Sequence, residues 1–171
     1  MKKYILLCIA VLAMSSCENN AAKYRPSQFP NKKSYSYAIP FSNQGGSIMV
    51  RIKLNDGPEF KGVWDTGCEL PLKISELEAE SLVKDGTLTV NDYKASIPVT
   101  SANGETNYYN VYMLSSISFT DENGNEHIVP DVPAIIDDNQ ATNILIGLPL
   151  MQELGYSHEE STYEQLIYVK E

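Results

Sequence analysis

The stretch that most constrains this chain is an apolar run that ends in an acid and a glycine turn. Val63 and Trp64 lead directly into Asp65, and Thr66 and Gly67 follow it. A carboxylate at the end of a strand among apolar residues is costly unless it is paired or used in chemistry. We therefore interpret Asp65 as the candidate for chemistry, and the rest of the chain as the scaffold that positions it.

A second motif lies far downstream, near the C-terminus. Residues 143–150 read Asn-Ile-Leu-Ile-Gly-Leu-Pro-Leu, an apolar run that meets a glycine and then a proline. Together with Asp65-Thr66-Gly67, this run resembles the retropepsin-like aspartic proteases. That family pairs a strand ending in Asp-Thr/Ser-Gly with a later apolar-apolar-Gly run that opens a short helix. Both motifs occur here in the same order, and the resemblance covers about residues 45–169.

The resemblance implies an all-β fold, a single-lobed and closed retropepsin-like barrel with one or two short helices. It also implies aspartic endopeptidase activity, with Asp65 as the catalytic residue and Thr66, Gly67 and Cys68 on its active-site loop. Gly67 would let a backbone N–H approach and hold the carboxylate, because glycine has no Cβ. Thr66 would hydrogen-bond through its hydroxyl across the axis of a dimer.

Two further groups of residues have implied roles. A flap hairpin would close over an extended peptide, bind it by strand-like pairing and exclude water. Its tip would consist of Ser101, Ala102, Asn103 and Gly104. Ile146 and Gly147 would pack beneath the active-site loop as structural support.

Peptide hydrolysis without a metal, a cofactor or a covalent intermediate needs two carboxyl groups that share one proton. One activates a water molecule, and the other, still protonated, polarises the scissile carbonyl. The sequence contains a single Asp-Thr/Ser-Gly motif. The catalytic unit would therefore be a homodimer in which two copies of Asp65 face each other across a two-fold axis. The alternative is a catalytically silent peptide-binding or interaction lipoprotein on the same fold.

The residue pattern independently predicts many short strands. Apolar and polar residues alternate over residues 48–54, the period-2 signature of a half-buried strand. Residues 132–136 and 144–146 are continuous apolar runs suited to buried central strands. Residues 122–125 predict a tight hairpin, and residues 166–169 predict a terminal strand. Short strands at such close spacing indicate an all-β, barrel-like domain.

Two short helices are expected. Residues 75–78, Ser-Glu-Leu-Glu, form a capping box, and Leu77, Leu82 and Val83 would be the apolar stripe of the helix that follows. Pro149 suits the first turn of a second helix, because a proline there loses no hydrogen bond.

The N-terminus resembles a bacterial lipoprotein signal. Lys2 and Lys3 form a positive region, residues 4–14 form an apolar core too short to span a bilayer, and residues 15–17 form a small-residue site. The site ends in Cys17, and in that class the cysteine is lipidated and becomes the first residue of the mature chain. The alternative is an ordinary secretory signal that is cut nearby.

This interpretation divides the chain into three parts. Residues 1–16 are the signal peptide, residues 17–33 a flexible polar tether, and residues 34–171 the protease domain. The protein would be exported and held in a membrane by lipidated Cys17, at the periplasmic face of the cell envelope or at the cell surface.

Charge and cysteine content limit the partners further. A net charge of −9 and a pI near 4.7 argue against nucleic acid, because phosphate binding needs clustered Lys and Arg. Cys8 leaves with the signal and Cys17 takes the lipid, so Cys68 is the sole thiol of the mature chain and no intramolecular disulfide is expected. The expected role of Cys68 is structural filling, and the alternative is a redox-sensitive switch on the dimer.

The other polar groups favour no second chemistry. His127 and His158 lie far apart, without ligands at metal-binding spacing, and are expected to be surface residues. Asp137-Asp138-Asn139 lacks a calcium-loop pattern and is expected to be a solvated turn. The chain contains no Gly-x-Ser-x-Gly elbow for Ser-His-Asp catalysis. The sequence therefore predicts neither a metal site nor a cofactor.

Overall fold

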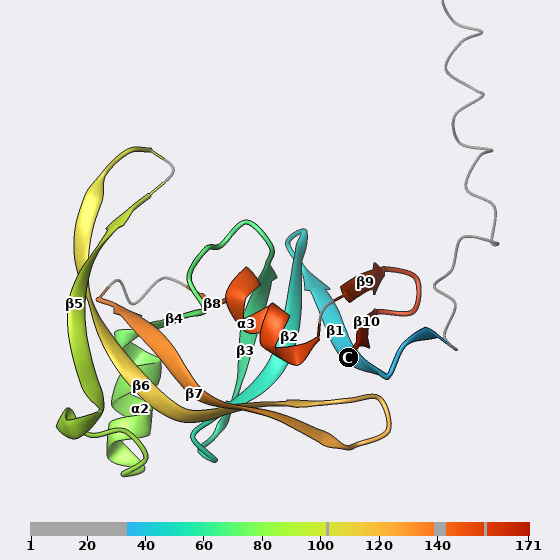
Figure 1. Ribbon diagram of the computed structural model, residues 1–171, viewed down its shortest axis with the longest axis horizontal. Helices are drawn as coiled ribbons and strands as arrows, with labels where there is room; N and C mark the ends of the chain where they lie inside the picture. Colours follow the sequence, from blue (N-terminus) through green and yellow to red (C-terminus); the bar gives the residue numbers. More distant parts are fainter. Residues whose placement is uncertain (1–33, 102, 139–142, 156) are drawn as a thin grey trace, which may run out of the picture. The chain divides into compact units, whose positions relative to one another are not determined.

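The computed structural model describes residues 34–101, 103–138, 143–155 and 157–171, and it confirms the expected all-β fold (Figure 1). Ten strands carry most of this part of the chain, together with two α-helices and one 3-10 turn. The strands are β1 (Tyr37–Gln44), β2 (Ser47–Leu54), β3 (Glu59–Asp65), β4 (Leu72–Ser75), β5 (Tyr93–Thr100), β6 (Thr106–Thr120), β7 (Glu126–Asp137), β8 (Ile144–Gly147), β9 (Ser157–Ser161) and β10 (Leu166–Lys170). The helices are α2 (Glu76–Lys84) and α3 (Leu148–Leu154), and the 3-10 turn is η4 (Val90–Asp92).

Six of the strands close into a barrel. Their order is β6-β7-β4-β8-β3-β2, and β2 then pairs again with β6. Closure is possible because β6 is long: its first half pairs with β5, and its last residues, Ile117 to Phe119, pair with β2. The expected closed barrel is therefore confirmed, and the closing ladder removes the free edge that an open sheet would leave.

The barrel interior is filled by the alternating residues that the sequence predicts. Val50, Ile52 and Leu54 of β2 all point inward and are almost completely buried, whereas Arg51 and Lys53 between them are exposed. The inward side chains meet aromatic neighbours from other strands. Trp64 packs edge to face against Phe119, a favourable arrangement for two aromatic rings, with 6.5 Å between their centroids.

Helix α2 begins at the predicted capping box but buries a different stripe. The carboxylate of Glu78 accepts hydrogen bonds from the backbone N–H of Ser75, at 2.8 Å, and from its hydroxyl. Ala79 and Leu82 are the buried residues, whereas Leu77 and Val83 are 49% and 57% exposed. The expected stripe was therefore wrong for Leu77 and Val83. This short helix has one side on the sheet, and only Ala79 and Leu82 reach it.

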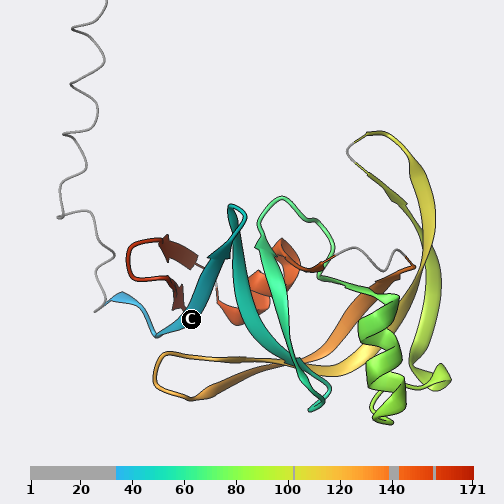
Figure 2. The same cartoon turned by 180° about the vertical axis from the view of Figure 1, so that it is seen from behind.

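The first and last strands extend the sheet beyond the barrel. β1 pairs with β2 through its second half and with β10 through its first half, and β10 in turn pairs with β9. The predicted terminal strand is thus present as β10, packed between two others (Figure 2). No helix within the described ranges is both long and apolar enough to cross a bilayer. The proposed signal, the tether and Cys17 lie outside the described residues.

The hairpin between β6 and β7 is organised by one carboxylate. Asp121 accepts hydrogen bonds from the backbone N–H groups of Asn123 and Asn125, each at 2.8 Å, and from the Asn125 amide. The His127 ring contacts the same carboxylate at 3.2 Å and stacks on Tyr37 with 3.6 Å between ring centroids. His127 was expected to be a surface residue, and it is instead partly buried, with 21% of its side chain exposed, because its ring lies between the hairpin and β1.

This network gives stability a specific dependence on pH. Burial alone would raise the pKa of Asp121, but hydrogen bonds from Asn125, His127 and Asn123 outweigh it and lower the pKa to about 2. Because the folded pKa is below the ordinary value, the stabilisation is present above about pH 4 and is lost as the pH falls toward 2.

We predict that Asp121→Asn lowers the free energy of unfolding at neutral pH by about 2 kcal/mol, because an amide cannot accept all of these hydrogen bonds. The difference from wild type should shrink as the pH falls from about 4 toward 2. Urea denaturation at several pH values measures the loss of unfolding free energy and its dependence on pH. Asp56→Asn, at an exposed turn, is the matched control and should change little. A difference in unfolding free energy between wild type and Asp121→Asn that is the same at every pH would contradict the lowered pKa of Asp121.

Candidate active site

Asp65 is the last residue of β3, and it is half-buried. The chain turns immediately after it, so that the backbone N–H of Gly67 donates a 3.0 Å hydrogen bond to Asp65 Oδ1. The N–H of Cys68 closes the same turn by donating to the Asp65 carbonyl at 3.1 Å. Thr66 and Gly67 are exposed. The expected contact between Gly67 and the carboxylate is thus present.

A parallel ladder brings the two sequence motifs together. β3 pairs in parallel with β8, so Trp64 lies opposite Ile146, and Asp65 lies opposite Gly147. Ile146 is completely buried beneath the strand end. The arrangement juxtaposes Asp65 with two residues that lie about eighty positions later in the chain.

Gly147 is a glycine because the active-site loop crosses directly over it. An added Cβ would lie 1.8 Å from the Leu70 carbonyl oxygen and 2.8 Å from that of Cys68. The loop is also tied down by backbone hydrogen bonds, from Gly147 N–H to the Pro71 carbonyl at 3.0 Å and from Leu148 N–H to the Cys68 carbonyl at 2.9 Å. Loop and glycine therefore form one packed unit behind Asp65.

The Cys68 thiol is bound within this loop. Its thiol donates to the Leu70 carbonyl at 3.6 Å. Burial raises the pKa of the Cys68 thiol, although the Leu70 hydrogen bond and the positive charge of Lys73 act in the opposite direction. A protonated thiol is a poor nucleophile, which fits structural filling. The redox-switch alternative stays a prediction.

The register of the ladders shows which side chains share a face with Asp65. Paired residues, and residues two apart on one strand, project to the same side of a sheet. Val63 is therefore on the side of Asp65, and a continuous row leads from it across β8, β4, β7 and β6. The row consists of Val63, Leu145, Lys73, Ile135 and Val111. We call this row, together with Asp65, the Asp65 face.

The opposite face of the same strands is the barrel core. Trp64, Ile146, Leu72 and Ala134 form the adjacent row and are at most 5% exposed. The Asp65 face thus lies on the other side of these strands, where Val63, Leu145 and Lys73 are partly exposed and Ile135 and Val111 are buried. The side chains along it are apolar except for Asp65 itself and Lys73.

The predicted flap is a hairpin formed by β5 and β6. Its strands pair continuously from Ala95–Val111 to Thr100–Thr106, and the tip closes with a 2.9 Å hydrogen bond from Ser101 N–H to the Glu105 carbonyl. Asn103 accepts hydrogen bonds from the Ser101 hydroxyl and, at 3.1 Å, from the Glu105 N–H. Gly104 has a φ of +85°, which suits glycine. Ala102 lies outside the described residues.

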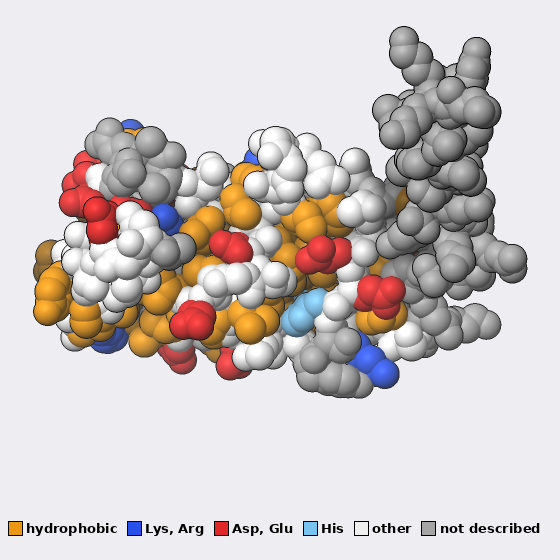
Figure 3. Space-filling model, turned by 90° about the horizontal axis from the view of Figure 1, so that it is seen from above, with side chains coloured by type: hydrophobic (Ala, Val, Ile, Leu, Met, Phe, Trp, Pro, Cys, Tyr) orange, Lys and Arg blue, Asp and Glu red, His pale blue; other side chains and the backbone are white. Residues whose placement is uncertain are grey.

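The hairpin and the active-site loop rise from the same side of the barrel (Figures 1 and 2). The view onto that side shows apolar side chains with acidic groups between them (Figure 3). The structure therefore places the proposed flap tip residues Ser101, Asn103 and Gly104 on the side where Asp65 lies. Among the described residues, no hydrogen bond or ion pair joins the tip to Asp65.

Two residues near the site differ from expectation. His158 is half-buried, with its ring edge to face against Trp64 at 5.6 Å, and burial lowers its pKa although a hydrogen bond to the Met151 backbone acts in the opposite direction. It is therefore not the surface residue that was predicted. Asp137 is 7% exposed and forms a 3.0 Å ion pair with Lys73, so the solvated-turn interpretation was wrong for this residue.

Lys73 is the residue of this region that sequence reasoning missed. It lies between Leu72 and Ile74, both completely buried, on the strand that follows the active-site loop. Strict alternation across β4 was the available signal, because it places the middle residue on the Asp65 face.

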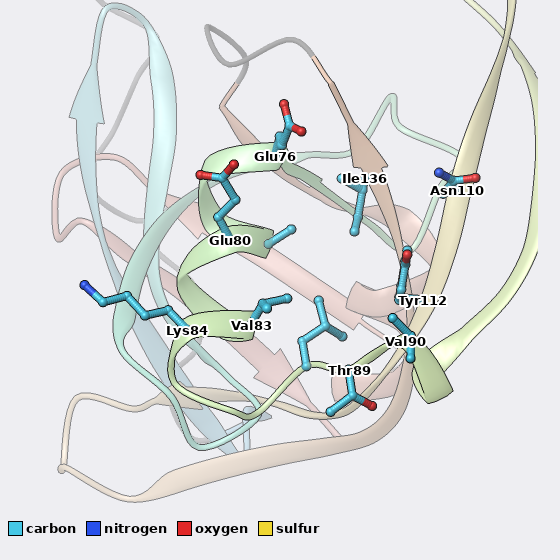
Figure 4. A pocket seen from close by; sticks show the side chains of 11 residues that line it. Glu76, Glu80, Val83, Lys84, Thr89, Val90, Asn110, Tyr112 and Ile136 are labelled. Carbon is cyan, nitrogen blue, oxygen red and sulfur yellow. The ribbon is translucent and has the colours of Figure 1, made fainter.

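A separate hollow of about 460 Å³ lies between α2 and the neighbouring strands β6 and β7 (Figure 4). Its apolar lining includes Ala79, Val83, Leu88, Val90, Tyr112 and Ile136. Neither the Asp65 loop nor the flap tip contributes a lining residue. The hollow is therefore not part of the candidate active site.

We predict that Gly147→Ala lowers the free energy of unfolding by about 3 kcal/mol, because backbone atoms of the loop must move to admit the methyl group. Thermal denaturation measures the loss. Gly67→Ala is the comparison, since its Cβ would meet only Asp65 Oδ1, at 3.3 Å. Equal stability of the two variants would show that the loop does not rest on Gly147.

Comparisons with known proteins show the fold. No protein-family model matches the sequence, and no curated protein matches it. Among solved structures, the chain is similar to the crystal structure of a retropepsin-like aspartic protease from Rickettsia conorii. The two share 19% sequence identity with a TM-score of 0.54, over 76% of this chain and 86% of the other. At this identity the likeness carries the architecture alone, and the fold of this chain is a retropepsin-like closed barrel with two short helices.

Proposed function

We propose that this protein is an aspartic endopeptidase whose active site forms when two copies of the chain bring their Asp65 carboxyls together. The observation that carries the proposal is the position of Asp65. It ends a strand, is held by the Gly67 N–H at 3.0 Å, and lies on an apolar face on the same side as a hairpin. The retropepsin-like fold supports this reading.

The chemistry requires the second copy. One carboxylate alone can orient a water molecule, but a second, protonated carboxyl must polarise the peptide carbonyl. The sequence has one Asp-Thr-Gly motif, so the partner acid comes from another chain. Two carboxyls close together cannot both ionise, and they would therefore hold one proton between them.

The hairpin of β5 and β6 supplies the remaining part of the proposed mechanism. Its tip backbone is exposed, so an extended peptide can pair with it as an added strand. Closure of the hairpin over the peptide would exclude water from the dyad and strengthen its electrostatic interactions. Backbone pairing binds any extended sequence, and the Asp65 face then distinguishes among side chains.

We predict that Asp65→Asn abolishes peptide hydrolysis and leaves the fold unchanged, because the amide cannot accept or hold the shared proton. The decisive measurement mixes wild type with Asp65→Asn under subunit exchange. At equal amounts, a shared dyad retains about one quarter of the activity, since only wild-type pairs are active. Independent sites would retain about half.

Asp131→Asn is the matched control, because it makes the same chemical change at an exposed position with positive φ, which asparagine tolerates. It should cleave like wild type. Cleavage by purified Asp65→Asn, or none by wild type under dimeric conditions, would refute the peptidase and leave the peptide-binding alternative.

We also propose that the protein is exported and anchored through lipidated Cys17. The basis is the sequence pattern of residues 2–17. Cys17→Ser should move the protein from the membrane fraction to the soluble fraction and remove metabolic labelling with palmitate, because the lipidation position of the signal no longer carries a thiol. Cys68→Ser, which leaves the signal intact, is the control. Unchanged membrane recovery of Cys17→Ser would contradict the anchor.

A further inference from the structure

Apart from Asp65, one residue of the Asp65 face is charged, and it forms an ion pair with an acid at the end of β7. Lys73 of β4 lies between Leu145 and Ile135 in the ladder, and its ammonium is 3.0 Å from Asp137 Oδ2 at the end of β7. The two side chains are only 17% and 10% exposed. An ion pair that is largely removed from water is rarely a net gain in stability over apolar packing, so its presence calls for another reason.

Lys73 has hydrogen-bonding capacity left over. An ammonium carries three donors. Among the described residues the Lys73 ammonium has one hydrogen-bond partner, Asp137. Its charge also reaches the active-site loop, because it lowers the pKa of the Cys68 thiol against the effect of burial. Lys73 therefore combines unused donors with a position on the Asp65 face, two strands away from β3.

The surroundings restrict what can use these donors. Val63 and Leu145 are partly exposed apolar residues of the same row, whereas Ile135, on the other side of Lys73, is buried. A ligand side chain that packs here needs an aliphatic stem against the row and an oxygen acceptor at its end. Glu and Gln have this composition, whereas Leu or Val would cover the ammonium without satisfying it.

We propose that Lys73 is a specificity-determining residue, which selects peptides that carry Glu or Gln at the position packed against the Asp65 face. This inference rests on the proposed function in that it takes the ligand to be an extended peptide. Asp137 has a defined part: it neutralises Lys73, and thereby keeps a neutral amide nearly as acceptable as a carboxylate.

The experiment measures peptide binding, so that it does not depend on turnover. Full-length Asp65→Asn is titrated with fluorescent peptides in which each position in turn is Leu, Gln or Glu. At one position Glu and Gln should bind about tenfold more tightly than Leu, the size of a hydrogen bond to a charged group. Adding Lys73→Met should abolish or reverse this preference at that position alone.

Asp137→Asn should have the opposite effect to Lys73→Met on the peptide preference. It removes the neutralising carboxylate but keeps Lys73, so the preference for Glu over Gln should increase at the same position. If Lys73→Met unfolds because the buried Asp137 carboxylate loses the Lys73 charge, the double variant with Asp137→Asn removes both charges and should still lose the preference. Lys73→Arg keeps the positive charge and should therefore retain the preference for Glu and Gln.

The control is the ion pair between Lys53 and Glu126, which joins β2 and β7 at 3.4 Å with side chains 46% and 39% exposed. Lys53→Met and Glu126→Gln should leave every preference unchanged. The inference is overturned if no position of any peptide prefers Glu or Gln, if no peptide binds, or if Lys73→Met weakens all peptides equally. If peptides bind with the stated preference but wild type does not cleave them, the proposed peptidase fails and the role of Lys73 stands.

Discussion

The parallel pairing of β3 with β8 is the constraint on which the rest of the site depends. It places Asp65 opposite Gly147 and aligns Trp64 with Ile146 in the core. The loop after Asp65 can cross the end of β8 only because Gly147 has no side chain. The carboxylate is thus positioned by backbone packing and by the Gly67 N–H, rather than by a network of polar side chains.

The sequence predicted those features that depend on local periodicity. Alternation identified the inward residues of β2, and the capping box located the start of α2. Local periodicity gave the wrong burial for residues whose contacts come from distant parts of the chain. Asp137 looked like a solvated turn because Lys73 is 64 positions away, and His127 looked exposed because Tyr37, which covers it, belongs to another strand. Such contacts follow from strand order, which local pattern does not encode.

Strand β6 links the two halves of the candidate site mechanically. Its first half is one arm of the β5–β6 hairpin, the proposed flap, and its last residues close the barrel against β2. Phe119 near its end packs on Trp64, the residue before Asp65. A single strand therefore connects the element that would move over a peptide to the aromatic packing beneath the carboxylate. The barrel end of β6 is completely buried at Ile117 and Phe119, so we expect any bending of β6 to occur in the hairpin half.

The fold of one copy positions Asp65 but does not complete a catalytic site. In a single chain Asp65 is half-buried, and its carboxylate accepts a hydrogen bond from the Gly67 N–H. In the proposed dimer, the second Asp65 would supply a like charge and displace water, and these two effects together compel the pair to hold one proton. Assembly would thus create the chemistry, whereas the Asp65 face, with its Lys73–Asp137 pair, is already formed in each copy. Binding specificity and catalytic competence would accordingly arise at different levels of structure, the first from tertiary packing and the second from association.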